Sequence, residues 1–385
     1  DSTYPYPELS GCGVGFKLLH AFSIRNGFDF SEIEPLLDLV AVSIASDIVP
    51  ITGENRILMH YGLSKLNSNP SYGLKGIIDI CGLSRKKIGV SDIVFKIGPR
   101  INASGRMMNG KEAVDLLLAG DFATAREKSK NIDKYNEDRR ELDKRITDEA
   151  LDFIDNHSDI ASLKGIVIYN ENWHKGIVGI VASRLTERYY RPAIVLTKSN
   201  NLISGSARSI AGFDVYKAIE SCRDILENFG GHTYAAGLSL REENFEEFKR
   251  RFEQISFDEV NPTTMHPQIT IDAEITLDKI TPEFVAQLSR FNPFGPKNET
   301  PFFLSRKVSD SGESRLVGKD LNHIKMEIVD ETVSSPVQAI AFGSDQHFAA
   351  IKENRPFDIC YTIEENVHGS KAFIQLMIKD IRISP

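Results

Sequence analysis

Hydrophobic and polar positions follow different patterns in successive regions of this 385-residue chain. In the first region, 1–109, small and apolar residues recur at helical spacing over 11–22, and a second helix is predicted over 55–66. Two apolar runs with β-branched residues, 36–46 and 92–97, are typical of buried strands. The alternation predicts an α/β region with a largely parallel sheet.

A long polar stretch occupies 110–160. Acidic and basic residues alternate there, and apolar residues recur sparsely, at Ile132, Tyr135, Leu142, Ile146, Leu151 and Ile154. This pattern predicts a mostly solvated helix that connects two domains.

In the third region, 161–260, the hydrophobic pattern again alternates between strand and helix spacing. Strands are predicted in GIVIYN, PAIVLT and LISGSAR, and helices in HKGIVGIVASRLTERY and DVYKAIESCRDILENF. The glycines that follow the second helix fit a helix C-cap, and TYAAGL after them predicts a further helix. A second α/β domain is expected here.

Short alternating runs fill the last region, 261–385, including FFLSRKVSD, HIKMEIVD, VQAIAFG and FIQLMIKDIRI. Five or six short strands separated by turns predict a small β-barrel, and an OB-fold is the natural candidate. The predicted fold class is therefore α/β, with two α/β lobes joined by a long helix and a C-terminal β-barrel.

Composition narrows the class of protein. The chain is 41% hydrophobic and 26% charged, and it contains neither an apolar run long enough to cross a bilayer nor a basic-then-apolar leader. We therefore expect no membrane association and a cytoplasmic location. Its four cysteines lack CxxC spacing, which favours free thiols over a zinc site or disulfides. The net charge of −8 argues against broad electrostatic binding of nucleic acid but permits one local basic groove.

Two motifs of the third region suggest phosphate chemistry. Ser206 and Arg208 stand in GSARS, where both would project from one face of an extended segment. Gly230, Gly231 and His232 combine backbone freedom with a titratable side chain. The alternatives remain open, because two glycines can be a helix cap and a lone histidine is more often structural.

Other candidate side chains lie near predicted element ends. Arg100, Asn102 and Arg106 fall in FKIGPRINASGRM, predicted as a loop after a strand, where guanidinium groups would suit phosphate contacts or pair with surface acids. His174 precedes a glycine-bearing helix and could either face an anion or simply cap that helix.

Asp47 follows the predicted strand at 36–46, a position where open α/β sheets present ligand-binding groups. Its carboxylate could hold a hard divalent ion, but one aspartate cannot complete such a site. A turn or cap before Pro50 is the alternative.

Six motifs, taken in order, resemble one family. They are SIASDIVPITGENRILMHYGL, FKIGPRINASGRM, WHKGIVGIVASRLTERYYRPAIVL, GSARSIAGFDVYKAI, FGGHTYAAGLSL and FNPFGPKN. Together they resemble the RecJ family of single-strand-specific 5′→3′ DNA exonucleases in the DHH phosphoesterase superfamily. The resemblance spans nearly the whole chain and is weakest over the last hundred or so residues.

This resemblance implies a division into part of a DHH domain (1–109), a connector helix (110–160), a DHHA1 domain (161–260) and an OB domain (261–385). It also implies a metal-dependent exodeoxyribonuclease of DNA repair and recombination that uses two Mn²⁺ or Mg²⁺ ions, with a 5′-ended single strand as substrate. A RecQ-type helicase and a single-strand binding protein are the implied partners. By the same resemblance Asp47 is a metal ligand and His232 the catalytic candidate. The implied substrate contacts are Arg100, Asn102, Arg106, Ser206, Arg208, Gly230 and Gly231. His174 is a further candidate substrate contact, on its position before the helix.

One departure from the family pattern matters. The family's Asp-x-Asp and Asp-His-His metal motifs are absent before Asp47. We therefore expect the sequence to be the C-terminal portion of a longer protein, and the chain alone to bind DNA weakly and hydrolyse it little. Two alternatives remain: a superfamily phosphodiesterase for short oligonucleotides or cyclic dinucleotides, and a catalytically silent DNA-binding scaffold.

Overall fold

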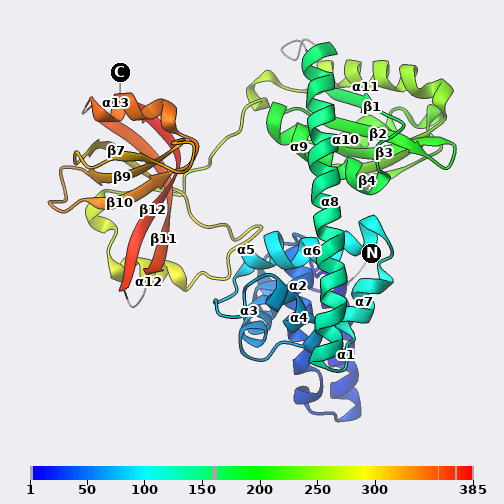
Figure 1. Cartoon of the computed structure of the whole chain (residues 1–385), viewed down its shortest axis with the longest axis horizontal. Coiled ribbons are helices and arrows are strands. Elements are labelled where there is room, and N and C mark those ends of the chain that lie inside the picture. Colours follow the sequence, from blue (N-terminus) through cyan, green and yellow to red (C-terminus); the bar gives the residue numbers. More distant parts are fainter. Residues whose placement is uncertain (1–2, 158–162, 354, 369–370, 384–385) are drawn as a thin grey trace. The chain divides into compact units, whose positions relative to one another are not determined.

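The computed structural model describes residues 3–157, 163–353, 355–368 and 371–383. The chain forms two compact units (Figure 1). One comprises residues 1–69, 88–90 and 269–385, and the other residues 70–87 and 91–268. Each unit is described below by itself.

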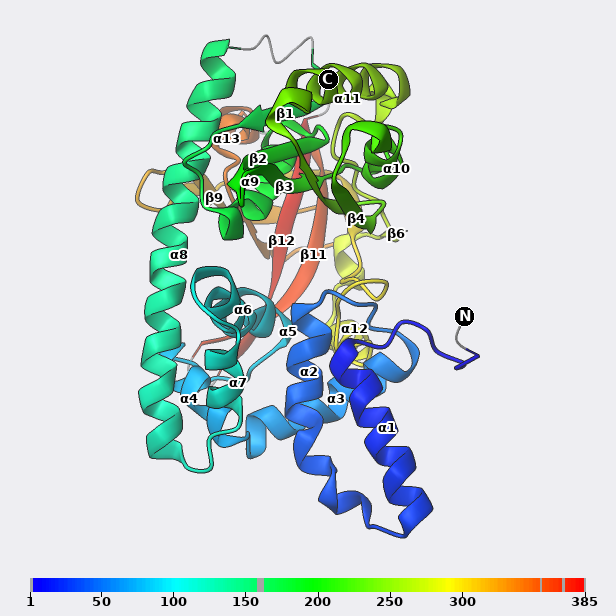
Figure 2. The ribbon, with the colours of Figure 1, turned by 90° about the vertical axis from the view of Figure 1, so that its right-hand side faces the viewer.

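Three helices begin the first unit: α1 (Gly11–Asn26), α2 (Leu37–Ser46) and α3 (Gly53–Ser68). The Ser10 side chain caps α1 by accepting a hydrogen bond from the Gly13 N–H, and Gly27 ends it in the left-handed conformation at φ 72°. Helices α2 and α3 approach closely, because a Cβ on Gly62 would lie 2.3 Å from the Leu37 carbonyl oxygen. Figure 2 shows these helices in blue.

The two strands predicted in the first region are wrong. Residues 37–46 form α2, which buries Leu37, Val40, Ala41 and Ile44 at helical spacing. Residues 93–97 form a π-helical turn that leads from α5 (Val90–Asp92) into α6 (Gly98–Met107). A short, fully buried apolar run does not distinguish a helix from a strand by periodicity, and here packing between helices decided the outcome. Within 3–109, all of which is described, the structure contains no strand, so the expected parallel sheet is not found there.

The second unit contains α4 (Tyr72–Ile80), α6, α7 (Lys111–Leu117) and the 36-residue α8 (Phe122–His157), which stands out as one long helix in Figure 1. The predicted connector is therefore helical, although it is broken between α7 and α8. One side of α8 is buried at Ile132, Ile146, Ala150 and Ile154, so the helix is less solvated than its charge suggested.

A five-stranded sheet follows α8. Its strands are β1 (Ile166–Tyr169), β2 (Ala193–Ser199), β3 (Leu202–Arg208), β4 (Asn228–His232) and β5 (Ala235–Leu240), in the order β1-β2-β3-β5-β4. Only β1 and β2 pair in parallel; the other neighbours are antiparallel. Helices α10 (Val215–Glu220) and α11 (Phe245–Glu259) pack on one face, whereas α8 and α9 (Lys175–Tyr189) pack on the other, over β1 and β2.

The strands predicted in this sheet are present, but the segment 230–238 differs from the prediction. Gly230 and Gly231 lie within β4 rather than at a helix C-cap, and TYAAGL leads into β5 rather than forming a helix. Paired backbone groups of β4 and β5 explain the change, because the ladder satisfies both segments at once.

The C-terminal strands of the first unit form a closed barrel, as predicted. They are β6 (Ala273–Glu274), β7 (Phe303–Asp310), β8 (Arg315–Val317), β9 (His323–Val329), β10 (Val337–Ala341), β11 (Phe357–His368) and β12 (Lys371–Ile383). Pairing of β7 with β9 closes a ring through β11, β12 and β10. Alternate residues of β9, Ile324, Met326 and Ile328, fill the interior. The short helices α12 (Pro282–Ser289) and α13 (Phe348–Lys352) accompany the barrel.

In the described ranges, no helix is long and apolar enough to span a membrane.

Candidate nucleic-acid interface

The second unit gathers several predicted residues on one face of its sheet. The register pairs Val195 with Ser206, Ser206 with Gly237, and Gly237 with Gly230. Two residues further along the strands, the register pairs Ala193 with Arg208, Arg208 with Ala235, and Ala235 with His232. Directly paired residues share a face, and Val195 and Ala193 pack against α8 and α9, so Ser206 and Arg208 lie on that side as well.

Helix α9 covers only part of this face. A Cβ on Gly179 would lie 3.2 Å from both Ser206 Oγ and Arg208 Nη2, so this glycine lets both side chains lie against the helix. Beyond α9, a Cβ on Gly230 would meet nothing within 4 Å, and one on Gly237 only the Gly205 carbonyl oxygen at 3.8 Å. The result is a bare floor of glycine backbone beside a hydroxyl group and a guanidinium group.

The floor belongs to a cavity of about 540 Å³. Its lining residues are Lys175, Val178, Ser199, Asn200, Leu202, Ser204, Gly205, Ser206, Asn228, Phe229, Gly230, Gly237, Leu238 and Ser239. None of these described residues is an aspartate or glutamate. Sequence reasoning missed Ser204, Asn228 and Ser239, although the period-two spacing of Ser204, Ser206 and Arg208 in a strand indicated a shared face.

Arg106 and His174 meet at the N-terminus of α9. Arg106 Nη1 donates to the Gly176 carbonyl oxygen at 3.1 Å, and a Cβ on Gly176 would lie only 2.5 Å from the Arg106 carbonyl oxygen. His174 caps the helix, its Nδ1 accepting from the Gly176 N–H at 3.1 Å. Burial lowers the pKa of the Arg208 guanidinium, and the positive charge of Arg106 lowers the same pKa further. Arg106 contacts Gly176 and Arg208 lies against Gly179, one turn further along α9, so two guanidinium groups border the same helix. Such a pair favours an anion beside them.

Three other candidates lie elsewhere in the second unit or at its sheet edge. Arg100 is in α6 rather than a loop, and its Nε donates to Asp133 of α8 at 2.7 Å. Asn102 is exposed on the same helix. His232 is exposed at the end of β4, where its Nδ1 accepts from the Tyr234 N–H at 3.4 Å.

Asp47 does not end a strand but caps α2 at its C-terminus. Its Oδ2 accepts a hydrogen bond from Ser43 Oγ at 2.9 Å, and the side chain is exposed. Among the residues that the structure describes, no three His, Cys, Asp or Glu side chains gather so that they could hold a metal ion. The residues present therefore do not make a divalent-cation site by themselves, since such ions require several oxygen ligands.

Comparisons with known proteins agree with the two sheets. The family model described as DHHA1 domain matches residues 162–256, and the one described as RecJ OB domain matches residues 271–380. The chain is thus a DHHA1-domain protein with a C-terminal OB domain.

Two sequence relatives and one solved structure narrow the identification to one family. The chain is 34% identical to the single-stranded-DNA-specific exonuclease RecJ of Bacillus subtilis (strain 168), covering 99% of the chain and 48% of that relative. It is 31% identical to the protein of the same name from Dickeya dadantii (strain 3937), covering 99% of the chain and 68% of the relative. The crystal structure of RecJ in complex with Mg²⁺ from Thermus thermophilus superposes with a TM-score of 0.84 at 25% identity, covering all of the chain and 57% of that structure. The chain belongs to the RecJ family.

Proposed function

We propose that this chain serves in the hydrolysis of single-stranded DNA from its 5′ end, and that it supplies a surface that grips the strand. The observation that carries the proposal is the glycine floor of β4 and β5 beside Ser206 and Arg208. Because the chain spans about half the length of its Bacillus relative, the activity of the whole protein is part of the proposal.

The surface suits a sugar–phosphate backbone. Glycines without side chains let a strand approach the sheet, and serine hydroxyls and the Asn228 amide offer neutral hydrogen bonds. Arg208 and Lys175 add positive charge, and a guanidinium can contact a phosphate through two parallel hydrogen bonds. The names of the curated relatives, which specify single-stranded DNA, support this substrate.

The Thermus structures contain Mg²⁺ and Mn²⁺, and we propose the same ions for this protein. Of the predicted ligands this chain offers Asp47, so the described residues are assigned roles in binding and orientation rather than in a hydrolytic step. His232, exposed at the end of β4, is proposed to contact the strand near the reacting phosphate.

The biological setting is proposed on the family resemblance. A helicase would expose the single strand, a single-strand binding protein would hold it open, and both would act with this protein in the cytoplasm during DNA repair and recombination.

The role of Arg208 can be tested by equilibrium binding of oligonucleotides that carry a 3′ dye and either a 5′-phosphate or a 5′-hydroxyl. Replacing Arg208 with alanine removes a charge-assisted hydrogen bond, so we expect affinity for the phosphorylated strand to fall about tenfold or more. Affinity for the 5′-hydroxyl strand should fall less. Arg223→Ala, at an exposed arginine of the same unit, is the matched control. Unchanged discrimination between the two ends in Arg208→Ala would remove this residue from the site.

A further inference from the structure

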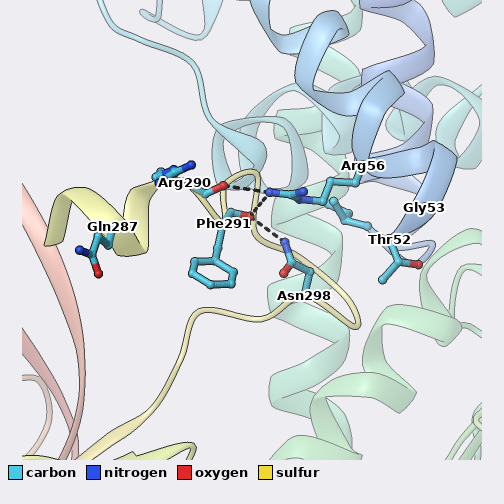
Figure 3. Close-up of a pocket in the computed structure, with 8 residues that line it drawn as sticks. Thr52, Gly53, Arg56, Gln287, Arg290, Phe291 and Asn298 are labelled. Carbon is cyan, nitrogen blue, oxygen red and sulfur yellow. Dashed lines mark hydrogen bonds between the residues drawn. The ribbon is translucent and has the colours of Figure 1, made fainter. Parts of the chain in front are cut away.

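A second cavity, of about 610 Å³, lies within the first unit, between the start of α3 and the segment that follows α12 (Figure 3). Its lining residues are Ile51, Thr52, Gly53, Arg56, Gln287, Arg290, Phe291 and Asn298. The segment includes FNPFGPKN, a motif that the strand-binding surface of the other unit does not use.

Hydrogen bonds fix the walls of this cavity. Arg56 Nη2 donates to the carbonyl oxygens of Arg290, Phe291 and Asn292 at 2.9, 3.2 and 3.3 Å. The Ile51 N–H donates to the Pro296 carbonyl oxygen at 2.8 Å. The Asn298 amide bridges the carbonyl oxygens of Phe291 and Pro293 at 3.0 and 2.9 Å. The segment is therefore held against α3, so the side chains of Arg290 and Phe291 stand on a fixed backbone.

The cavity carries positive charge that no lining carboxylate neutralises. Its described lining contains two arginines and no aspartate or glutamate. Glu54, in the first turn of α3, is engaged elsewhere: it accepts from the Tyr4 hydroxyl at 2.8 Å and pairs with Lys17 at 3.3 Å. In the described part of the chain, no carboxylate lies within ion-pair distance of the Arg290 guanidinium.

Arg56 has a remaining donor as well. Its Nε is buried, and no hydrogen-bond partner lies near it among the described residues. A buried donor without a partner costs free energy, so Arg56 holds the segment at a cost in stability.

An aromatic ring completes the set of groups. Phe291 is 56% exposed although it stands on a fixed segment, and Figure 3 shows its ring pointing away from the hydrogen bonds that Arg56 makes. The cavity lining thus combines an exposed ring, which is a stacking surface for a base, with a guanidinium that can contact a phosphate. The Gln287 amide can pair with base or sugar atoms.

We propose that this cavity binds one nucleotide unit of single-stranded DNA, with the base on Phe291 and the phosphate at Arg290. The proposal rests on the proposed function, because it gives the same strand a second contact in the other unit. A free nucleotide has the same chemistry, and the experiment must separate these two sources.

The test is fluorescence anisotropy of a labelled oligo-dT with the full 385-residue chain and two substitutions in it. Phe291→Ala removes a stacking partner and should weaken binding about fivefold or more. Arg290→Gln should weaken binding several-fold. It should also make the negative slope of log affinity against log salt shallower by about 0.7, as expected for one lost phosphate contact. Lys297→Gln is the matched control, because it removes the same charge from the same segment outside the cavity lining. We expect Lys297→Gln to change affinity less than about twofold.

The outcomes separate the cavity from the surface of the other unit. If the unsubstituted chain binds oligo-dT, and Arg208→Ala weakens that binding but Arg290→Gln and Phe291→Ala match Lys297→Gln, the cavity proposal is wrong and the proposed function stands. If dTMP competes as strongly as the oligonucleotide and its binding depends on Arg290, a free nucleotide is the ligand and the strand contact is excluded. The side chains of Arg290, Phe291 and Lys297 are exposed, so an unchanged melting temperature verifies the fold of each variant.

Discussion

Two adjacent glycines of β4 have different structural roles. Gly230 faces the open floor, where a Cβ would meet no atom within 4 Å. Gly231 has φ +151°, and a Cβ there would lie 2.3 Å from the Ala235 carbonyl oxygen. Glycine at 230 therefore keeps a surface clear, whereas glycine at 231 is required by the β4–β5 pairing.

Substitution by valine should weaken DNA binding at position 230 and lower the stability of the fold at position 231. Gly230→Val adds a strand-forming residue in open space, so we expect the free energy of unfolding to change by less than about 0.5 kcal/mol, whereas affinity for oligo-dT falls at least about fivefold. Gly231→Val should cost about 2 kcal/mol or more, because the side chain clashes with backbone. Urea denaturation and anisotropy measure the two quantities. Loss of stability at 230 without loss of binding would show that the floor does not contact DNA.

Sequence reasoning identified individual residues where local spacing carried the information. Ser206 and Arg208 were placed on one face because alternate residues of a strand share a face, and β3 has that geometry. Arg290 and Phe291 received no role, because the cavity that they line also depends on Arg56, which is far away in sequence. Long-range hydrogen bonds of this kind leave no local pattern.

At the scale of elements, one buried carboxylate joins α8 and α9. Asp143 is 2% exposed and accepts two hydrogen bonds from Arg184, from Nε at 2.9 Å and from Nη2 at 2.7 Å. Arg139 Nη1 lies 4.0 Å from the same carboxylate. Burial lowers the pKa of Arg139, and the attraction of Asp143 opposes that shift. This carboxylate therefore holds together the helices that flank the strand-binding face.

Asp143→Asn keeps the shape and removes the charge. Because Arg184 is half exposed and water can solvate it, we expect a loss of about 1–3 kcal/mol, less than the cost of breaking a fully buried pair. Trp173 is the single tryptophan, buried and bonded to Glu149 of α8, so its fluorescence in urea reports unfolding of this unit. Arg145→Gln, in an exposed pair on the same helix, is the control and should cost less than about 0.5 kcal/mol. Equal costs would show that Asp143 does not hold α8 to α9.

Elements could be predicted from the sequence where flanking signals agreed with periodicity. The alternating runs after 300 form barrel strands because polar residues separate them and one side of each is buried. The run at 36–46 offered no alternation, and its β-branched residues favoured a strand, yet residues at helical spacing pack against α3. Tertiary packing overrode the local preference.

For the whole molecule, charge is organised locally. The chain carries a net charge of −8, yet the cavity beside the glycine floor is lined by Lys175, the cavity beside α3 is lined by Arg56 and Arg290, and neither described lining contains a carboxylate. Net charge alone argued against nucleic acid, whereas the order of six motifs indicated the RecJ family, to which the chain belongs. Composition averages over the surface, so it could not reveal these cavities.

Amide hydrogen exchange of the chain with and without oligo-dT tests the site of strand binding most directly. Strand β4 is the edge of its sheet, and 175–178 is the first turn of α9, where His174 supplies the partners of the Gly176, Ile177 and Val178 N–H groups. Sheet edges and helix ends open more readily than a core, so both regions exchange in the free protein and can report a ligand. We predict that oligo-dT slows exchange at 228–232 and at 175–178. If oligo-dT binds but does not slow amide exchange in either segment, the placement of DNA on this face is contradicted.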